Sequence, residues 1–548
     1  MKPTVAKANC TILADLLASY GVEHVVLCPG SRNAPVSLAI ERSGKYRTHV
    51  IIDERSGAFV ALGMAKETGR PVAVAVTSGT ALLNCAPAVA EAYYARVPLI
   101  IVSADRPERW IDQRDSQTIR QPGALANIVR DTVDAPDTLE PSHINLLINR
   151  ALTAATGNIP GPVHINLPLD KPLTALIPSE KAVRGHKIHT DFAISPSPEA
   201  RADIYVRLTN MDKVLVVAGS GCDLSGVRFG GAGNIALLAD LSANCADAVC
   251  SPTSFDSHIL GKDLEPDVIV NLGGTIVSDH FKAFLRRCSC PTVNIGFDDA
   301  PVDTFGRLER QTQISPRVFM EQWDDYIKRS GIKTGSEYSL NWRELYGEEF
   351  SIPWGEKLSD YETLLHLYRA LMGENKKSGL TLFLANGMTA RYAQLFRWPA
   401  KVVDQRGVSG IEGCTSTAAG ASLATDSTVL LLTGDMGAAY DIGALATPGL
   451  QGNFKIAVTD NGGGDIFRHV PTTRDFPETE RLFAAAPQLP LLQLAAAYDF
   501  NYYTADSPDS LEEAITLFLA EQDRPAILHV KTDPDANQLH YSTFLSLK

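Results

Sequence analysis

Two segments in the C-terminal third of the 548-residue chain place oxygen donors directly after apolar runs. Asp435 follows the run 429–432, and Asn461 follows the run 455–459. Each run predicts a buried strand, and a helix over about 438–447 would join the two strands into one βαβ unit. The carboxyl ends of parallel strands meet at one edge of a sheet, so Asp435 and Asn461 should lie close together. A carboxylate, an amide oxygen and a nearby backbone carbonyl suit Mg²⁺ that is completed by phosphate oxygens and water.

Three glycines, Gly462, Gly463 and Gly464, follow Asn461 directly. Glycine lets the backbone approach a diphosphate closely, and a helix that begins after the loop would favour an anion. A Gly-Asp pair alone is more often a turn and helix cap, but two such motifs at consecutive strand ends are much less expected by chance. The chain has neither a G-x-x-x-x-G-K-[ST] loop nor a strand that leads into a dinucleotide-binding G-x-G-x-x-G fingerprint.

The spacing of Gly434-Asp435 and Asn461 resembles the motif of thiamin-diphosphate-dependent enzymes. The resemblance implies that Asp435, Asn461 and the carbonyl of Gly463 hold Mg²⁺ or Mn²⁺ against the cofactor's diphosphate. It also implies a glutamate at a strand end in the N-terminal domain, and Glu54, after the run 49–52, fits that place. In that family the carboxylate shares a proton with the pyrimidine ring of the cofactor, which promotes loss of the thiazolium C2 proton. Without the motif at Asp435, a lone Glu after a strand would be interpreted as a cap or surface residue.

Further segments are similar to the family of 2-succinyl-5-enolpyruvyl-6-hydroxy-3-cyclohexene-1-carboxylate synthases, which are thiamin-dependent enzymes of menaquinone biosynthesis. They are residues 28–35, 53–56, 77–81, 103–107, 115–118, 406–411 and 463–467. The resemblance is close in the first and last thirds of the chain and weak in the middle. It implies decarboxylation of 2-oxoglutarate and 1,4-addition of the resulting carbanion to isochorismate. Two alternatives stay open: a thiamin-dependent 2-oxo acid decarboxylase or carboligase with another acceptor, and a catalytically silent family member.

The resemblance assigns roles to individual positions, with Glu54 as the catalytic residue. The implied cofactor-binding residues are Glu54, Thr77, Gly79, Ser409, Ile411, Gly434, Asp435, Met436, Asn461, Gly463, Ile466 and Phe467. The implied substrate-binding residues are Ser31, Arg32, Arg106, Gln117, Asn386, Arg391 and Arg406. Both implied substrates are small anions with several carboxylates, which the planar fork of arginine recognises well. Taken singly, each arginine could equally be a surface charge or a salt-bridge partner.

Two positions depart from the family pattern. Gly387 stands where the family usually has a serine that contacts substrate, and Asp279 and His280 stand where an adjacent basic pair is expected. If this alignment is right, the carboxylate-binding patch is altered or has moved to Lys282 or Arg286. These departures bear on substrate identity more than on cofactor use.

The elements that must position these residues follow from alternating apolar runs and helical patterns. Continuous apolar runs separated by helices predict parallel sheets covered on both faces. The expected strands are 24–27, 49–52, 72–76, 99–102, 161–167, 214–217, 268–272, 292–295, 382–385, 429–432, 456–459 and 527–530. The fold class is therefore α/β with three parallel-sheet domains, and the resemblance implies that these are doubly wound domains of the thiamin-diphosphate-enzyme type. We expect an N-terminal pyrimidine-binding domain at 1–185, a central domain at 195–330 and a C-terminal diphosphate-binding domain at 355–548, with linkers at 171–200 and 325–355.

Composition limits the partners. The net charge of −13 argues against a broad nucleic-acid-binding face. The uncharged stretch 71–90 contains two prolines and Asn84, so we interpret it as strand, turn and helix, not as a membrane span. The nine cysteines form no C-x-x-C pair, which indicates reduced thiols in a cytoplasmic protein. Because the sites of the family lie between subunits, we expect a homodimer, which could pair further into a homotetramer.

Three other features receive structural interpretations. His469 lies near the glycine loop, but a satisfied structural histidine is favoured over a catalytic one. The loop 219–222 follows a strand and could cradle a phosphate or FAD, although the loop alone is a weak signal. Cys288 and Cys290 precede a strand and are interpreted as inert thiols.

Overall fold

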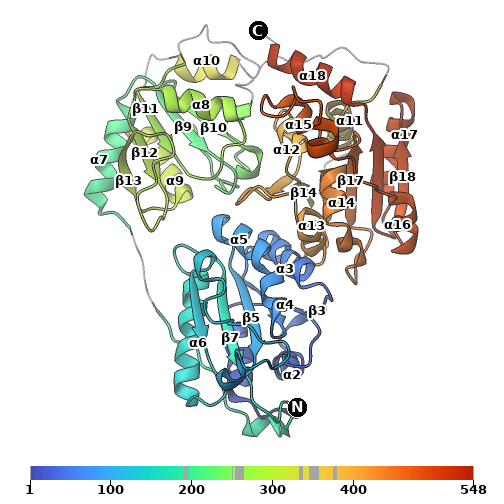
Figure 1. Ribbon diagram of the computed structural model, residues 1–548. Helices are drawn as coiled ribbons and strands as arrows, with labels where there is room; N and C mark the ends of the chain where they lie inside the picture. Colours follow the sequence, from blue (N-terminus) through green and yellow to red (C-terminus); the bar gives the residue numbers. More distant parts are fainter. Residues whose placement is uncertain are drawn as a thin grey trace.

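The computed structural model describes residues 2–190, 195–249, 251–253, 264–331, 337–344, 357–373 and 379–546. Three parallel sheets follow one another along the chain, each covered by helices on both faces (Figure 1). This confirms the expected α/β class with three doubly wound parallel sheets. We call the residues around these sheets the first, central and third units.

The first unit has a six-stranded sheet in the order β3-β2-β4-β5-β7-β6. Its strands are β2 (His24–Leu27), β3 (Arg47–Val50), β4 (Val72–Val76), β5 (Leu99–Asp105), β6 (Asp131–Asp134) and β7 (Val163–Pro168). One face packs on α1 (Ala8–Ser19), α2 (Ala34–Ser43) and α6 (Pro141–Thr156), and the other on α3 (Glu54–Thr68), α4 (Thr80–Asn84) and α5 (Ala86–Tyr94). A small antiparallel pair, β1 (Thr4–Val5) with β8 (Leu176–Ile177), lies apart from this sheet. Alternate strand residues belong to the two cores, which explains the unbroken apolar runs.

The central unit has the strand order β10-β9-β11-β12-β13. These strands are β9 (Val214–Ala218), β10 (Ile235–Ala239), β11 (Val268–Asn271), β12 (Thr292–Ile295) and β13 (Leu308–Thr312). Helices α7 (Pro198–Thr209) and α9 (Pro316–Ser330) cover one face, and α8 (Asp279–Arg287) and α10 (Tyr338–Glu344) cover the other. The linkers expected at 171–200 and 325–355 are therefore partly wrong. Helix α7 begins within 171–200. The end of α9 and all of α10 lie within 325–355. Tyr338 and Trp342 are buried against the sheet, so the aromatic residues of this polar segment are core residues.

The third unit has the strand order β15-β14-β16-β17-β19-β18. These strands are β14 (Leu380–Leu384), β15 (Lys401–Asp404), β16 (Thr428–Gly434), β17 (Phe454–Asp460), β18 (Asn501–Ala505) and β19 (Ala526–Lys531). The helices are α11 (Asp360–Gly373), α12 (Met388–Ala393), α13 (Cys414–Ser422), α14 (Asp435–Tyr440), α15 (Ile466–His469), α16 (Leu491–Ala497), α17 (Pro508–Ala520) and α18 (Pro534–Ser546). The helix expected at about 438–447 is instead α14, which begins at Asp435, followed by a 3₁₀ segment at Ile442–Ala446.

Every expected strand overlaps a strand of the structure, but some boundaries differ. The strand expected at 49–52 is β3, which ends at Val50, so Ile51 and Ile52 lie beyond it. The strand β5 continues through residues 103–105, which were expected to follow it. In the part of the chain that is described, no helix is both long and apolar enough to cross a membrane.

The first and third units meet through the helices α3 and α13 (Figure 1). A Cβ atom added to Gly63 on α3 would overlap the carbonyl oxygen of Thr417 on α13. Conversely, a Cβ atom added to Gly420 on α13 would overlap the carbonyl oxygen of Val60 on α3. The two helix backbones are thus in direct contact, and glycine is required at both positions.

We expect the substitution Gly63→Ala to destabilise the protein by about 1–3 kcal/mol, because the added methyl group forces the two helix backbones apart. The readout is the first transition in thermal or urea unfolding. Gly443→Ala is the control, since a Cβ atom at Gly443 makes only an ordinary contact 3.8 Å from the Ser56 hydroxyl at the same interface. Equal melting temperatures for the two variants would contradict the direct backbone contact.

Candidate active site

Asp435 and the glycine loop after β17 lie together at the carboxyl edge of the third sheet. Asp435 is 1% exposed and begins α14, directly after β16. One carboxylate oxygen accepts the Met436 backbone N–H at 2.7 Å, and the other accepts the Gly463 backbone N–H at 2.6 Å. Burial first, and the neighbouring Asp460 second, raise the pKa of Asp435 to about 7. A buried carboxylate of this kind gains from a nearby cation.

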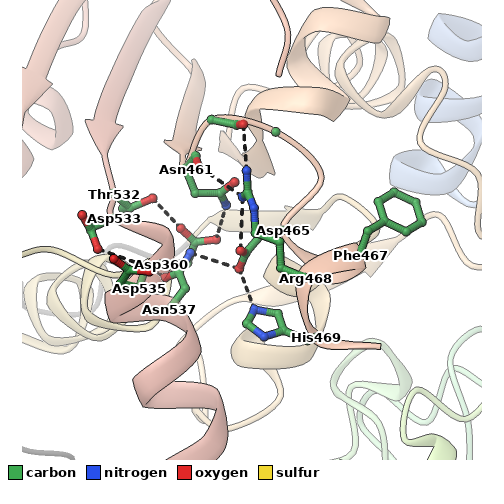
Figure 2. Close-up of polar contacts among 12 residues, drawn as sticks. Asp360, Asn461, Asp465, Phe467, Arg468, His469, Thr532, Asp533, Asp535 and Asn537 are labelled. Atoms are coloured by element: carbon green, nitrogen blue, oxygen red, sulfur yellow. Dashed lines mark hydrogen bonds and ion pairs between the residues drawn. The ribbon is translucent and has the colours of Figure 1, made fainter. Parts of the chain in front are cut away.

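The Asn461 side chain is oriented by a second buried carboxylate (Figure 2). Its Nδ2 donates to Asp360 at the start of α11 at 3.1 Å, whereas its buried Oδ1 has no hydrogen-bond partner among the described residues. Asp360 is itself fixed, because its carboxylate accepts from the Thr532 hydroxyl at 2.7 Å and its backbone N–H donates to Asn537 at 2.8 Å. The amide oxygen is therefore available as a ligand for a metal cation.

Gly463 has a backbone conformation that only glycine fits. Its φ is +135°, and an added Cβ atom would lie 2.5 Å from the Ala484 carbonyl oxygen. The next residue, Gly464, donates its N–H to that carbonyl at 2.7 Å. The loop is thus held between Asp435 on one side and the segment at Ala484 on the other, as a loop that cradles a diphosphate requires.

The donor set at this edge fits a hard divalent cation. It comprises one carboxylate, one amide oxygen that no described residue binds, and the backbone carbonyls of a glycine loop. Within the described ranges, no group of three or more His, Cys, Asp or Glu side chains could hold a metal ion. A site for a transition metal built from such clusters is therefore not found among these residues, whereas oxygen donors completed by phosphate suit Mg²⁺.

The short helix α15 follows the glycine loop and carries Ile466 and Phe467. Ile466 is half-buried, and Phe467 is exposed and points away from the polar network around Asp465 (Figure 2). His469 is buried and contacts Asp465 at 2.9 Å, which is the arrangement expected of a structural histidine.

A second loop at the same edge connects β15 to α13 and carries Arg406, Ser409 and Ile411. Nη1 of Arg406 donates to Asn386 Oδ1 at 3.3 Å, and its buried Nε has no partner among the described residues. The Asn386 amide donates to the carbonyls of Gln405 and Gly410, so Asn386 ties the two ends of the loop together. Ser409 has a φ of +64° and is exposed, and Ile411 is half-buried.

The two departures from the family pattern have visible structural counterparts. Gly387 precedes α12 with a φ of +107°, and open space surrounds the position of a Cβ atom there. Asp279, the first residue of α8, lies 2.6 Å from Lys282 and 3.9 Å from Arg391. Burial alone would raise the pKa of Asp279, but Lys282 and then Arg391 hold this pKa below its usual value. A carboxylate of the central unit therefore faces an arginine of the third.

Glu54 lines a separate cavity of about 230 Å³ in the first unit. It is the first residue of α3, whose N-terminus is capped by Asp53, and its carboxylate accepts from Asn84 Nδ2 at 3.0 Å. The other lining residues are Thr77, Ser78, Gly79, Thr80, Ala81, Asp115, Gln117, Thr118 and Ile119. The hydroxyls of Thr77 and Ser78 are buried and have no partner among the described residues. These polar groups are thus available to a ligand.

Two arginines lie close together in the first unit. Arg32 is 5% exposed, and its Nη1 donates to the Leu169 carbonyl at 2.8 Å. Arg106 lies 3.2 Å from Asp115 and donates to the Ser116 carbonyl at 3.0 Å. Burial first, and Arg106 second, lower the pKa of Arg32. The buried Nε atoms of both arginines have no partner among the described residues, so the pair is suited to an anion.

The two groups of residues lie in different units of the chain, and we call them half-sites. The Glu54 cavity is lined only by residues of the first unit, whereas the contacts given above for Asp435, Asn461 and Gly463 come from the third. Arg55, next to Glu54, comes within 4.0 Å of Asp441. Asp441 follows the C-terminal end of α14, whereas Asp435 begins this helix. Sequence reasoning missed Asp360 and Asn84, which orient the predicted residues from distant positions in the chain.

Comparison with known proteins finds two family domains, one in the first unit and one in the third. Residues 10–124 match the thiamine pyrophosphate enzyme N-terminal TPP binding domain, and residues 385–530 match the C-terminal TPP binding domain. A 2-succinyl-5-enolpyruvyl-6-hydroxy-3-cyclohexene-1-carboxylate synthase of Desulfotalea psychrophila is 34% identical over 96% of this chain and 99% of its own. Synthases of the same name from Porphyromonas gingivalis and Flavobacterium johnsoniae are 33% and 32% identical, over 96% and 98% of this chain and 94% and 98% of their own. The chain therefore belongs to the 2-succinyl-5-enolpyruvyl-6-hydroxy-3-cyclohexene-1-carboxylate synthase family of thiamine pyrophosphate enzymes.

Proposed function

We propose that the protein decarboxylates 2-oxoglutarate and adds the resulting four-carbon unit to isochorismate in 1,4 fashion, with loss of CO₂. The product would be 2-succinyl-5-enolpyruvyl-6-hydroxy-3-cyclohexene-1-carboxylate, for menaquinone biosynthesis. Two observations carry this proposal, in a chain related along nearly its whole length to synthases of that name. The buried Asp435 binds the glycine loop that follows Asn461, and Asn461 Oδ1 has no partner among the described residues.

The proposed metal ligands are Asp435, Asn461 and the carbonyl of Gly463, with Mg²⁺ or Mn²⁺ as the ion. The ion would neutralise the buried carboxylate and the diphosphate together. When bound, thiamin diphosphate supplies the carbon nucleophile and the electron sink for decarboxylation. The residues proposed to line its pocket are Thr77, Gly79, Ser409, Ile411, Gly434, Met436, Ile466 and Phe467.

Glu54 is proposed to hold and return the proton at the pyrimidine ring of the coenzyme. Its hydrogen bond from Asn84 leaves one carboxylate oxygen for that contact. The substrate carboxylates would be bound by cations from both half-sites, with Ser31 and Gln117 as polar contacts at the exposed rim. The proposed cations are Arg32, Arg106, Arg391 and Arg406. Asn386 holds the loop that carries Arg406. Fixed local cations are needed because the net charge of the chain, −13, repels anionic substrates.

We also propose that the active unit is a homodimer, alone or paired into a homotetramer, in which the first unit of one chain faces the third unit of another. The location of the half-sites in two different units of the chain supports this arrangement. Apolar side chains beside each half-site support it further: Ile52 is 85% exposed next to the Glu54 cavity, and Val408 is exposed in the Arg406 loop. The proposed domains are 1–185, 195–330 and 355–548, and α10 extends the central one because it packs on the central sheet. We place the protein in the cytoplasm, where the described cysteines, all free, would stay reduced.

The purified protein should release CO₂ and form product only when 2-oxoglutarate and isochorismate are both supplied with thiamin diphosphate and Mg²⁺. Glu54→Gln should lower kcat by about 10²–10⁴-fold, because the amide cannot exchange a proton. The exposed Glu41→Gln serves as control. Turnover of another 2-oxo acid or acceptor would favour the carboligase alternative, and coenzyme binding without turnover would favour a silent protein. Wild-type kcat in Glu54→Gln would remove Glu54 from the mechanism.

The substitution Gly463→Ala should weaken coenzyme binding in the presence of Mg²⁺ by about tenfold or more, which corresponds to at least ~1.4 kcal/mol. The reason is that the new methyl group would displace the loop from Ala484 and from Asp435. Calorimetric titration of the apoprotein measures the effect. Gly462→Asn is the matched control, because its neighbourhood is open and Asn tolerates its φ of +75°. Equal affinities for the two variants would argue against a diphosphate site at this loop.

Co-expression of Glu54→Gln and Asp435→Asn chains tests the shared site. Each variant alone should be nearly inactive. Mixed dimers would contain one intact site and one doubly altered site, so random pairing should restore about a quarter of wild-type activity. If Glu54 instead served Asp435 of its own chain, the mixture would stay as inactive as either parent.

A further inference from the structure

The loop that carries Arg406 is held by side chains of both other units. At its start, the Asp404 carboxylate accepts hydrogen bonds from the hydroxyls of Ser220 and Ser242 in the central unit, each at 2.6 Å. Asn244 of the same unit pairs with both backbone groups of Val402, at 2.8 and 3.0 Å. The end of β15 is thereby fixed against the central unit.

The middle of the loop is held by Glu91 on α5 of the first unit. Glu91 is only 2% exposed. Its Oε1 accepts the Gly407 backbone N–H at 3.0 Å, and its Oε2 accepts the Val408 backbone N–H at 2.8 Å. An added Cβ atom on Gly407 would lie 2.6 Å from the Glu91 carbonyl oxygen, so the loop backbone packs directly on α5.

Lys66 on α3 completes the arrangement. Its Nζ donates to Glu91 Oε1 at 3.1 Å and to the Asp404 carbonyl at 2.7 Å. Both side chains of this pair are almost fully buried. A buried ion pair adds little net stability, because removing two charges from water offsets their attraction. Its directional contacts, however, define the geometry of the backbone that they hold.

The residue between these anchors is Arg406. Asp404 and Gly407 are fixed on either side of it, and Asn386 holds one nitrogen of its guanidinium. Its buried Nε has no partner among the described residues, so the guanidinium is held in place but keeps an unused hydrogen-bond donor. We propose that Lys66 and Glu91 are positioning residues for Arg406: they fix its backbone so that its guanidinium meets a substrate carboxylate. This inference rests on the proposed function for the role of Arg406, but the restraint of the loop does not.

The pair also connects the two half-sites. Lys66 lies near the C-terminal end of α3, and Glu54 is the first residue of the same helix. In a dimer with shared sites, one α3 helix therefore supplies Glu54 to one site and supports the Arg406 loop of the other.

The test compares Glu91→Gln with a matched control, Glu67→Gln. Glu67 lies on α3 next to Lys66 and, like Glu91, contacts the third unit, through Lys401 at 3.1 Å and Thr381 at 3.2 Å. Within the described part of the chain, its contacts do not include the Arg406 loop. Two readouts are made on the full-length protein. One is hydrogen exchange of the 405–411 amides in the apoprotein, and the other is the KM for each substrate with the holoenzyme, alone and combined with Arg406→Ala.

We expect the Gly407 and Val408 amides to exchange at least tenfold faster in Glu91→Gln and at the wild-type rate in Glu67→Gln. The KM for one substrate should rise about tenfold, which corresponds to one lost charge-assisted hydrogen bond, with kcat changed much less. In the Arg406→Ala background, Glu91→Gln should raise that KM no further. If Glu91→Gln does not fold, Gly407→Ala tests whether the loop must pack on α5 to position Arg406. Its methyl group moves the loop off α5 and should raise the same KM.

Unchanged exchange at Gly407 and Val408 would overturn the proposed restraint. Effects of Glu91→Gln and Arg406→Ala that multiply would overturn the link to Arg406. If the wild-type protein showed no turnover of the two substrates, the proposed function would fail, and the exchange experiment would still decide whether Glu91 restrains the loop.

Discussion

Direct backbone contact between α3 and α13 is the constraint on which the proposed site depends. Glycine at positions 63 and 420 lets two helices from different units touch without intervening side chains. Helix α3 begins at Glu54 and carries Lys66 near its other end, and α13 begins directly after the loop of Arg406 and Ile411. A shift of one helix against the other would therefore move a proposed proton-transfer residue and a proposed substrate-binding loop together. The contact is rigid because packed backbones cannot adjust as side chains can.

The polar groups at the two half-sites are destabilising in isolation. Arg32 lies buried near a second guanidinium, and Asp435 is buried near Asp460. Among the described residues, the Nε atoms of Arg32, Arg106 and Arg406 and the Oδ1 of Asn461 also have no hydrogen-bond partner. Buried groups of this kind normally find partners, and exceptions concentrate where a ligand supplies the missing contact. The cations gather where anionic substrates are proposed to bind, and the carboxylate lies where a metal ion is proposed.

Sequence patterns predicted the elements whose signal is local. The α/β class follows from apolar runs buried on both faces, and the proximity of Asp435 to the loop of Asn461 follows from consecutive parallel strands. Five strands of the parallel sheets were missed, and all five lie at sheet edges: β6, β10, β13, β15 and β18. Polarity explains β6, β13 and β18 but not β10, which is a buried apolar run. The helix α10 was missed because its buried aromatics lie in a polar segment. Asp360 and Glu91 could not be found in this way. Their partners lie 101 and 316 residues away, and only the packing of separate elements brings them together.

The departures from the family pattern change how cations are shared at the third-unit half-site. Asp279 lies 3.9 Å from Arg391 and partly neutralises this arginine, which is proposed to bind a substrate carboxylate. Gly387 adds no hydroxyl there, and its φ of +107° disfavours any residue that would. Of the two arginines proposed to bind substrate at this half-site, Arg406 makes its hydrogen bond with the neutral Asn386, whereas Arg391 lies 3.9 Å from the Asp279 carboxylate. A site that relies on one guanidinium needs that group held in place, which gives a physical reason for a buried ion pair from another unit behind its backbone.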